Sequence, residues 1–358
     1  MQEGAEPLAL MADACTSCGE CVRPCSFLRQ QGPPAQIAQR GIERKNLLSA
    51  YGCSLCGLCD ALCPEGLSPS AMFLAMRQKA AAQGLVELRP YRSWLNYEKL
   101  GSHPLFQRDS IPVGCRTVFF PGCSLSGSRP DAVRGLYRLL QQHDPAVGLV
   151  LDCCGKISHD LGLVDRFEGI FSRLAQRLHA RGIVRVLTTC PGCSKVFRNH
   201  AKAFEVTSVY ELLTQAGRAV PQQGTDAGGL PAVSIHDPCP SRFDAAQQQA
   251  VRQLAVSCGY RVEELPDSRR YTRCCGQGGM VEGCVPGVVK KEAALIGAEA
   301  AGRPLLSSCG ACCETLGRVT STAHIADLLT GTGTFSTKPV SSRMRWINRL
   351  KLAFLRLS

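Results

Sequence analysis

Residues 53–64 read Cys53-Ser-Leu-Cys56-Gly-Leu-Cys59-Asp-Ala-Leu-Cys63-Pro64, so two, two and three residues separate four successive cysteines. The same spacing occurs upstream, at Cys15, Cys18, Cys21 and Cys25. Both stretches belong to a chain of 358 residues that holds 22 cysteines. Thiol chemistry is therefore expected to organise the amino-terminal part of the fold.

Two motifs of this spacing are typical of a domain that binds two [4Fe-4S] cubane clusters, because three close thiolates wrap one cluster and the fourth reaches across to the other. One cubane is expected on Cys15, Cys18, Cys21 and Cys63, and the second on Cys53, Cys56, Cys59 and Cys25. Zinc would be satisfied by pairs of CxxC motifs. Like disulfides, it would leave the repeated spacing of two, two and three residues unexplained. Helix-forming runs at 42–50 and 71–80 predict that residues 1–86 form a helical ferredoxin domain.

Further along, a second pattern of cysteines occurs twice. The first copy holds Cys123, the adjacent pair Cys153 and Cys154 before a glycine, and the pair Cys190 and Cys193. The second copy holds Cys239, Cys274, Cys275, Cys309 and Cys312. Equivalent cysteines are offset by 116 to 121 residues, which indicates a duplicated domain.

Short β-prone runs precede the cysteines of each copy, and helical runs follow them. The runs before the cysteines are 117–120, 148–151 and 184–187 in the first copy, and 233–235, 261–263 and 304–306 in the second. The repeated order of strand, cysteine and helix predicts a parallel sheet whose sites gather beyond the carboxyl ends of its strands. Five thiols per copy are expected to converge there. A structural zinc site needs four and would be closed to substrate, so a less regular centre is favoured.

The pattern Cys, Cys-Cys-Gly, Cys-x2-Cys resembles the CCG cysteine-rich domains of the catalytic part of heterodisulfide reductase. The second copy fits closely, whereas the first is a few residues short before its Cys153-Cys154-Gly155. The whole arrangement resembles fused heterodisulfide reductase subunits and the iron–sulfur subunits of anaerobic glycerol-3-phosphate dehydrogenase and of glycolate oxidase. The resemblance implies one or two noncubane four-iron clusters, each on five CCG cysteines, which cleave a disulfide.

The expected architecture is multidomain, α and α/β, with a helical two-cluster ferredoxin domain followed by two repeated CCG domains that contain short parallel sheets. The expected boundaries are a ferredoxin domain at 1–86, a connector at 87–114, CCG domains at 115–225 and 226–330, a linker at 331–342 and a basic helix at 343–358.

Two functions are compatible with this organisation. One is a disulfide reductase in which the cubanes relay single electrons to reactive CCG centres, with His236 as a candidate proton donor. The other is an electron-transfer subunit between a flavoprotein dehydrogenase of glycerol-3-phosphate, glycolate or lactate type and the quinone pool. Two complete CCG sets favour the reductase, because a protein that only transfers electrons does not need two unusual sites.

Either function requires a redox partner subunit, either a flavoprotein or a membrane cytochrome or other quinone-linked protein. The chain has no flavin or nucleotide fingerprint of its own, since the glycines after Cys275 lack the second half of GxGxxG. The net charge is +12, but aromatic residues make up only 6%, and no basic–aromatic run suggests nucleic-acid binding. The opening residues lack a basic segment, so reduced thiols and a cytoplasmic location are expected.

Residues 343–358 predict a basic amphipathic helix. Its expected apolar face carries Trp346, Ile347 and Leu350, opposite Arg345 and Arg349. Such a helix can lie on the inner face of the cytoplasmic membrane, dock on a partner subunit or pack on its own domain, and the sequence leaves all three open. Four cysteines have no assigned role, and Cys258 is interpreted as a small core residue; the other three are Cys115, Cys284 and Cys313.

Overall fold

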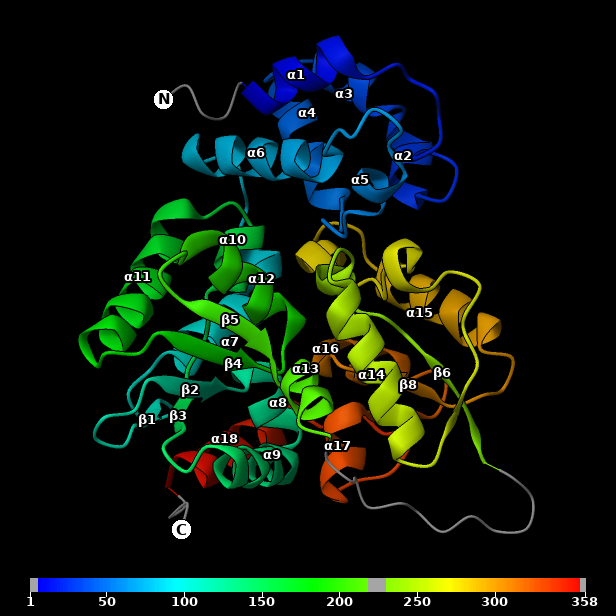
Figure 1. Cartoon of the computed structure of the whole chain (residues 1–358). Helices are drawn as coiled ribbons and strands as arrows, with labels where there is room; N and C mark the ends of the chain where they lie inside the picture. Colours follow the sequence, from blue (N-terminus) through cyan, green and yellow to red (C-terminus); the bar gives the residue numbers. More distant parts are fainter. Residues whose placement is uncertain (1–5, 218–229, 355–358) are drawn as a thin grey trace.

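The computed structural model describes residues 6–217 and 230–354. The expected boundary between the two CCG domains, at residues 225 and 226, lies outside this described part, as do residues 355–358 of the carboxyl-terminal segment. Figure 1 shows three bodies: a helical amino-terminal module above two α/β modules that lie side by side.

The amino-terminal module is helical, as the sequence predicts, with no strand among described residues 6–86. Its helices are α1 (Glu6–Ala14), α2 (Ser26–Gln31), α3 (Pro34–Gln39), α4 (Arg44–Ser49), α5 (Leu58–Leu62) and α6 (Pro69–Ala82). Helix α6 buries Met72, Phe73, Met76 and Ala80 completely, a spacing that places one side of the helix against the module's core. The Asp60 carboxylate accepts a hydrogen bond from the Ser70 backbone N–H at 2.9 Å and so caps the start of α6.

The segment after this module does more than connect. It forms α7 (Arg92–Gly101) and then β1 (Arg108–Ser110), which pairs antiparallel with β3 (Gly148–Leu151) as the edge strand of the first sheet. Strand β1 lies inside the stretch that the sequence predicts to be a connector.

The first α/β module alternates strands and helices around a sheet ordered β1-β3-β2-β4-β5. Its further elements are β2 (Thr117–Phe120), α8 (Gly122–Ser128), α9 (Pro130–His143), α10 (Lys156–Asp160), α11 (Val164–Ala180), β4 (Arg185–Thr188), α12 (Pro191–His200), β5 (Glu205–Ser208) and α13 (Val209–Gln215). Apart from β1, every neighbouring pair in this sheet is parallel. The parallel sheet is confirmed, and β5 is an additional strand that the sequence did not predict.

The second α/β module repeats this topology, with a sheet ordered β7-β6-β8-β9 and parallel throughout. Its elements are β6 (Ala232–Ile235), α14 (Ala245–Ser257), β7 (Arg261–Val262), α15 (Val288–Glu299), β8 (Leu305–Ser307), α16 (Gly310–Leu316), β9 (Thr322–His324) and α17 (Ile325–Thr330). The order matches β3-β2-β4-β5 of the first module strand for strand, as a duplicated domain requires.

The two α/β modules pack through equivalent helices. Helix α13 of the first lies on α14 of the second, and α17 of the second lies on α9 of the first. Since α9 and α14 occupy the same place in each repeat, as do α13 and α17, the contact is approximately two-fold symmetric. One apolar core runs through it and includes Leu136, Leu213, Val251 and Leu328.

The carboxyl-terminal helix α18 (Ser342–Phe354) packs on this chain, against α8 and α9. The predicted polar face is wrong at Arg349, which is only 3% exposed and donates to the Gly101 carbonyl at 2.8 Å. Its guanidinium lies 5.5 Å from the ring of Trp346 and 5.5 Å from that of Tyr97. A cation can occupy this face because aromatic rings and a backbone carbonyl replace water around it.

No helix among the described residues is both long and apolar enough to cross a membrane.

Candidate metal centres

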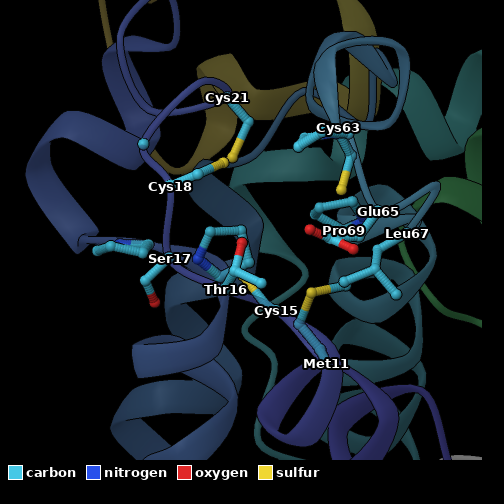
Figure 2. Close-up of a pocket in the computed structure, with 14 residues that line it drawn as sticks. Met11, Cys15, Thr16, Ser17, Cys18, Cys21, Cys63, Glu65, Leu67 and Pro69 are labelled. Atoms are coloured by element: carbon cyan, nitrogen blue, oxygen red, sulfur yellow. The ribbon is translucent and has the colours of Figure 1, made fainter.

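The first four-cysteine set assembles as the sequence predicts. Cys15, Cys18, Cys21 and Cys63 line one hollow, although Cys63 comes from the other motif (Figure 2). Burial raises the pKa of the Cys21 thiol to about 12, and the neighbouring charges of Cys15, Cys18 and Cys63 contribute to this rise, as four converging thiols must. Cys18 is exposed, so this hollow reaches the protein surface.

The second four-cysteine set lies deeper. Cys25, Cys53, Cys56 and Cys59 line a second hollow, which Cys274 of the second α/β module also lines. Burial raises the pKa of Cys53 and of Cys59, so neither thiol ionises readily by itself. A bound metal that accepts their lone pairs would reverse this.

The five cysteines of the first CCG pattern gather beyond the carboxyl ends of β2, β3 and β4. The sulfur atoms of Cys123 and Cys153 lie 4.0 Å apart. Cys193 is in hydrogen-bond contact with both Cys154 and Cys190. Gly122 precedes Cys123 with φ +77°, and a Cβ there would lie 3.0 Å from the Cys193 sulfur, so glycine permits the close approach.

The second CCG pattern assembles in the same way. The sulfur atoms of Cys275 and Cys312 lie 3.5 Å apart. Cys274 is in hydrogen-bond contact with Cys239 and Cys275, and Cys312 with Cys309. All ten CCG cysteines named by the sequence are therefore brought together, five in each module.

A direct thiol contact joins the amino-terminal module to the second CCG set. The largest influence on the Cys56 thiol is its hydrogen bond with Cys274, which raises the pKa of Cys56 well above its usual value, and burial adds to this. Arg242 supports the junction, since its Nε donates to the Cys56 carbonyl at 3.0 Å and its Nη2 to the Thr272 carbonyl at 2.8 Å.

The two CCG sets also face each other. A Cβ on Gly310, next to Cys309, would lie 2.9 Å from the Ser124 hydroxyl, next to Cys123. Lys156 lies against the first set, since a Cβ on Gly192 would lie 2.9 Å from its Cδ, and it binds both carboxylate oxygens of Asp160, at 2.7 and 2.6 Å. Burial disfavours the Lys156 charge, but Asp160 and the thiolates of Cys239 and Cys154 outweigh it and raise the pKa of the ammonium.

Lys156 also acts on the first set. The pKa of Cys190 is lowered to about 7, chiefly by the hydrogen bond from Cys193, and the charge of Lys156 contributes to the shift. The sequence gives little support for a role of Lys156, because nothing in its neighbourhood along the chain shows that Cys239, from the other repeat, is near it.

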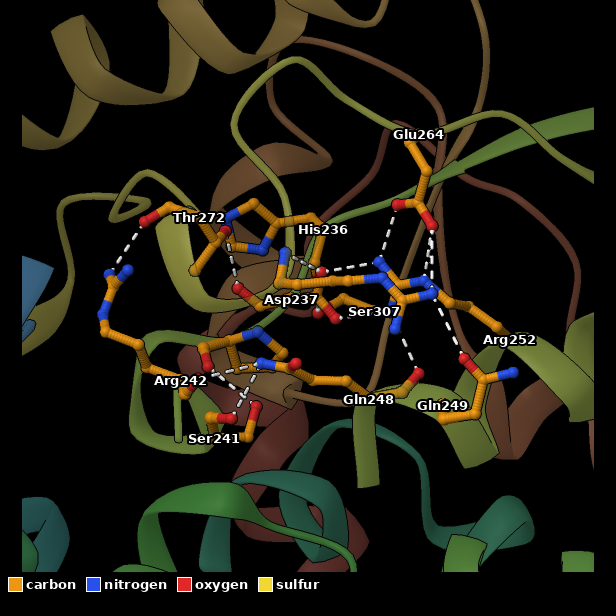
Figure 3. A network of polar contacts seen from close by, with 12 residues as sticks. His236, Asp237, Ser241, Arg242, Gln248, Gln249, Arg252, Glu264, Thr272 and Ser307 are labelled. Carbon is orange, nitrogen blue, oxygen red and sulfur yellow. Dashed lines mark hydrogen bonds and ion pairs between the residues drawn. The ribbon is translucent and has the colours of Figure 1, made fainter. Parts of the chain in front are cut away.

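His236 lies in a buried polar network beside the second set (Figure 3). Its Nε2 is 3.2 Å from the Arg273 carbonyl, and among the described residues its Nδ1 has no hydrogen-bond partner. Positive charge on His236 contributes to lowering the pKa of Cys275, after the hydrogen bonds from Cys274 and Cys312. The next residue, Asp237, is held by both Nη atoms of Arg252 at 2.8 Å, which fixes this turn.

Arg77 is another buried arginine that the sequence did not single out. It is fully buried on α6 and donates to backbone carbonyls of all three modules. The acceptors are Ala50, Tyr51 and Cys53 in the amino-terminal module, Asp160 in the first α/β module and Gly279 in the second. The only indication in the sequence was a basic residue on the otherwise apolar face of a predicted helix.

The four unassigned cysteines differ in their surroundings, and Cys313 directly follows Cys312 of the second set. Cys258 is buried in the apolar core, as predicted, and burial raises its pKa to about 11. The Cys115 thiol donates to the Thr117 carbonyl at 3.1 Å, and the Cys313 thiol to the Ala323 carbonyl at 3.4 Å. Cys284 is exposed.

The donor sets fit iron–sulfur clusters. Such clusters are held by cysteine thiolates, and each hollow or edge described above offers four or five thiols. Arginine and lysine near them (Arg77, Arg242 and Lys156) supply positive charge for anionic thiolate-bound groups.

Comparison with known proteins agrees with the two kinds of site. Residues 11–67 match a 4Fe-4S dicluster domain, and residues 117–198 and 233–320 match a cysteine-rich domain of CCG type. The chain is 23% identical to a subunit of the dihydromethanophenazine:CoB–CoM heterodisulfide reductase of Methanosarcina mazei, over 84% of this chain and 87% of that protein. It is 22% identical to the corresponding protein of Methanosarcina barkeri, over 76% of this chain and 80% of that protein.

Among solved structures, an aspartate racemase homologue from Pyrococcus horikoshii aligns with 60% of this chain and 96% of its own, at a TM-score of 0.25 and 11% identity. A TM-score this low supports no conclusion about the fold.

Proposed function

Because this chain joins a 4Fe-4S dicluster domain to two CCG domains and is homologous to a heterodisulfide reductase subunit, we propose that it is the iron–sulfur subunit of an oxidoreductase that reduces a disulfide. In this proposal Cys15, Cys18, Cys21 and Cys63 hold one cubane, and Cys25, Cys53, Cys56 and Cys59 the other. The five CCG cysteines of each module hold a noncubane four-iron cluster. Such clusters, when bound, pass single electrons and offer an iron to a thiolate.

The arrangement of the cysteine sets supports an electron relay whose first set lies at the protein surface. Cys18 is exposed, which suits the first set to meet a redox partner subunit. The second set lies inside and contacts the second CCG set through Cys56 and Cys274. A partner that is a flavoprotein or a quinone-linked membrane protein can use the same exposed set.

The observation that carries disulfide reduction is the position of Lys156 against the first CCG set, where its ammonium also interacts with Cys239 of the second. Splitting a disulfide takes two electrons and two protons and gives two thiols, so a site made of two facing halves suits the reaction. An ammonium held at this place stabilises thiolate as it forms.

A groove opens onto Cys239 of the second CCG set. Its walls come from all three modules and include Cys56, Pro191, Ser194, Lys195 and Cys239. Cys239 is thus accessible from the protein surface. A subunit that only transfers electrons needs no groove of this kind.

The test uses the full chain, purified anaerobically with any subunits that accompany it. Four clusters of four irons predict about sixteen irons per chain. With reduced viologen as donor, small disulfides are expected to be reduced by the wild type, while Cys239→Ser retains the amino-terminal clusters and loses the reaction. Reduction of a quinone analogue with no reduction of any disulfide would instead establish the alternative, an electron-transfer subunit between a flavoprotein dehydrogenase and quinone.

A further inference from the structure

Tyr210 carries a buried hydroxyl that the fold leaves without a partner. The residue is completely buried at the start of α13, and within the described ranges no hydrogen-bond partner is found for its Oη. A buried tyrosine ordinarily hydrogen-bonds its hydroxyl, because an unsatisfied buried donor loses its hydrogen bonds to water without replacement. Among the described residues, the Tyr210 hydroxyl is therefore a buried polar group whose hydrogen bond is missing.

Strand register places Tyr210 beside the first CCG set. Parallel strands β4 and β5 pair Thr188 with Ser208. Cys190 follows the first of these residues by two positions and Tyr210 follows the second by two, so both lie just beyond the carboxyl edge of the sheet. This is the edge at which the cysteines of the module gather.

Tyr210 also lies near the second CCG set. Burial raises the pKa of its hydroxyl well above the usual value, and its electrostatic interactions with Cys313, Cys190 and Cys309 raise it further. Cys190 belongs to the first set and Cys309 to the second, so the hydroxyl lies near the junction of the two. It keeps its proton at neutral pH, so it is able to donate a hydrogen bond there.

The second repeat has no equivalent hydroxyl. Strands β8 and β9 pair Ser307 with His324, and two positions beyond His324 the chain has Ala326. The His324 ring lies 6.4 Å from the Tyr210 ring, but its Nδ1 accepts from the Ala326 N–H at 3.1 Å. The approximate two-fold symmetry of the modules is broken at this position.

We propose that the Tyr210 hydroxyl donates a hydrogen bond to sulfur at the junction of the two CCG sets and thereby favours the reduced form of the centre held by the first set. The acceptor is a cysteine or inorganic sulfur of that centre, so the inference rests on the proposed function. Sulfur carries more negative charge after reduction and then accepts a stronger hydrogen bond, which is why donors to sulfur raise a cluster's potential.

The variant is Tyr210→Phe, which keeps the ring in the core and removes only the hydroxyl. The matched control is Tyr137→Phe, because Tyr137 is also buried, on α9, but donates to the Val147 carbonyl at 3.1 Å. Both are prepared as the full iron-loaded chain, and iron content is measured first. If the wild type loads iron only in its amino-terminal module, the proposed function is refuted, and this inference fails with it.

Two measurements test the hydrogen bond in loaded protein. In an electron paramagnetic resonance redox titration, Tyr210→Phe is expected to lower the reduced-to-oxidised ratio of the first CCG centre about tenfold at fixed potential, or ~59 mV for one electron, while Tyr137→Phe leaves it unchanged. Electron–nuclear double resonance on the wild type in H2O and D2O is expected to show an exchangeable proton coupled to that centre. Absence of that proton from the wild type, or a ratio in Tyr210→Phe within twofold of wild type, overturns the proposal.

Discussion

Replacing Arg77 with methionine tests whether one buried guanidinium holds the three modules together. Five backbone carbonyls would lose their donor: those of Ala50, Tyr51, Cys53, Asp160 and Gly279. At about 1 kcal/mol net for each lost bond the cost is about 5 kcal/mol. Apolar packing of methionine in the same space returns about 1 kcal/mol. The expected loss is about 4 kcal/mol, a large share of the roughly 5–15 kcal/mol that stabilises a typical domain.

The assay is anaerobic urea unfolding of the loaded full chain, with limited proteolysis to detect separation of the amino-terminal module. Arg77→Lys is expected to lose less, because an ammonium keeps the charge but has only three donors. Arg173→Met, at an exposed position on α11, is the matched control and is expected to change stability by less than about 0.5 kcal/mol. A loss below about 1 kcal/mol in Arg77→Met, with unchanged proteolysis, would show that the modules are joined by other contacts.

Four other changes are expected to separate the parts of the site. Cys56→Ser should remove about four irons per chain and stop electron passage from viologen to the CCG centres; unimpaired passage would exclude the relay through this residue. Lys156→Met, combined with Asp160→Asn so that no lone carboxylate is buried, should slow disulfide reduction about tenfold at unchanged iron content. His236→Gln should slow the same reaction severalfold, and equal turnover would remove the imidazole from the mechanism. Truncation after residue 342 should cost about 3 kcal/mol, since Leu352 is fully buried; altered membrane fractionation at unchanged stability would contradict this.

The cysteine sets were largely predictable because spacing along the chain decides which thiols can wrap one centre. The exchange of Cys63 into the first set and of Cys25 into the second is the arrangement typical of two-cluster ferredoxins, and the structure brings together both sets. The repeat offset likewise predicted two copies of one parallel topology. These features depend on the spacing of residues along the chain, which can be read directly from the sequence.

Contacts between modules were decided only in three dimensions. The meeting of Cys56 with Cys274 joins residues more than 200 positions apart in the chain, and no periodicity links them. The carboxyl-terminal helix was predicted, yet its inward side was not, because Arg349 is buried by aromatic rings from elsewhere in the chain. The same holds for Tyr210, which reads as an ordinary core residue until strand register places it beside Cys190. Residue type and spacing specify local structure, whereas the environment of a buried charge or hydroxyl is set by distant segments that only the folded chain brings together.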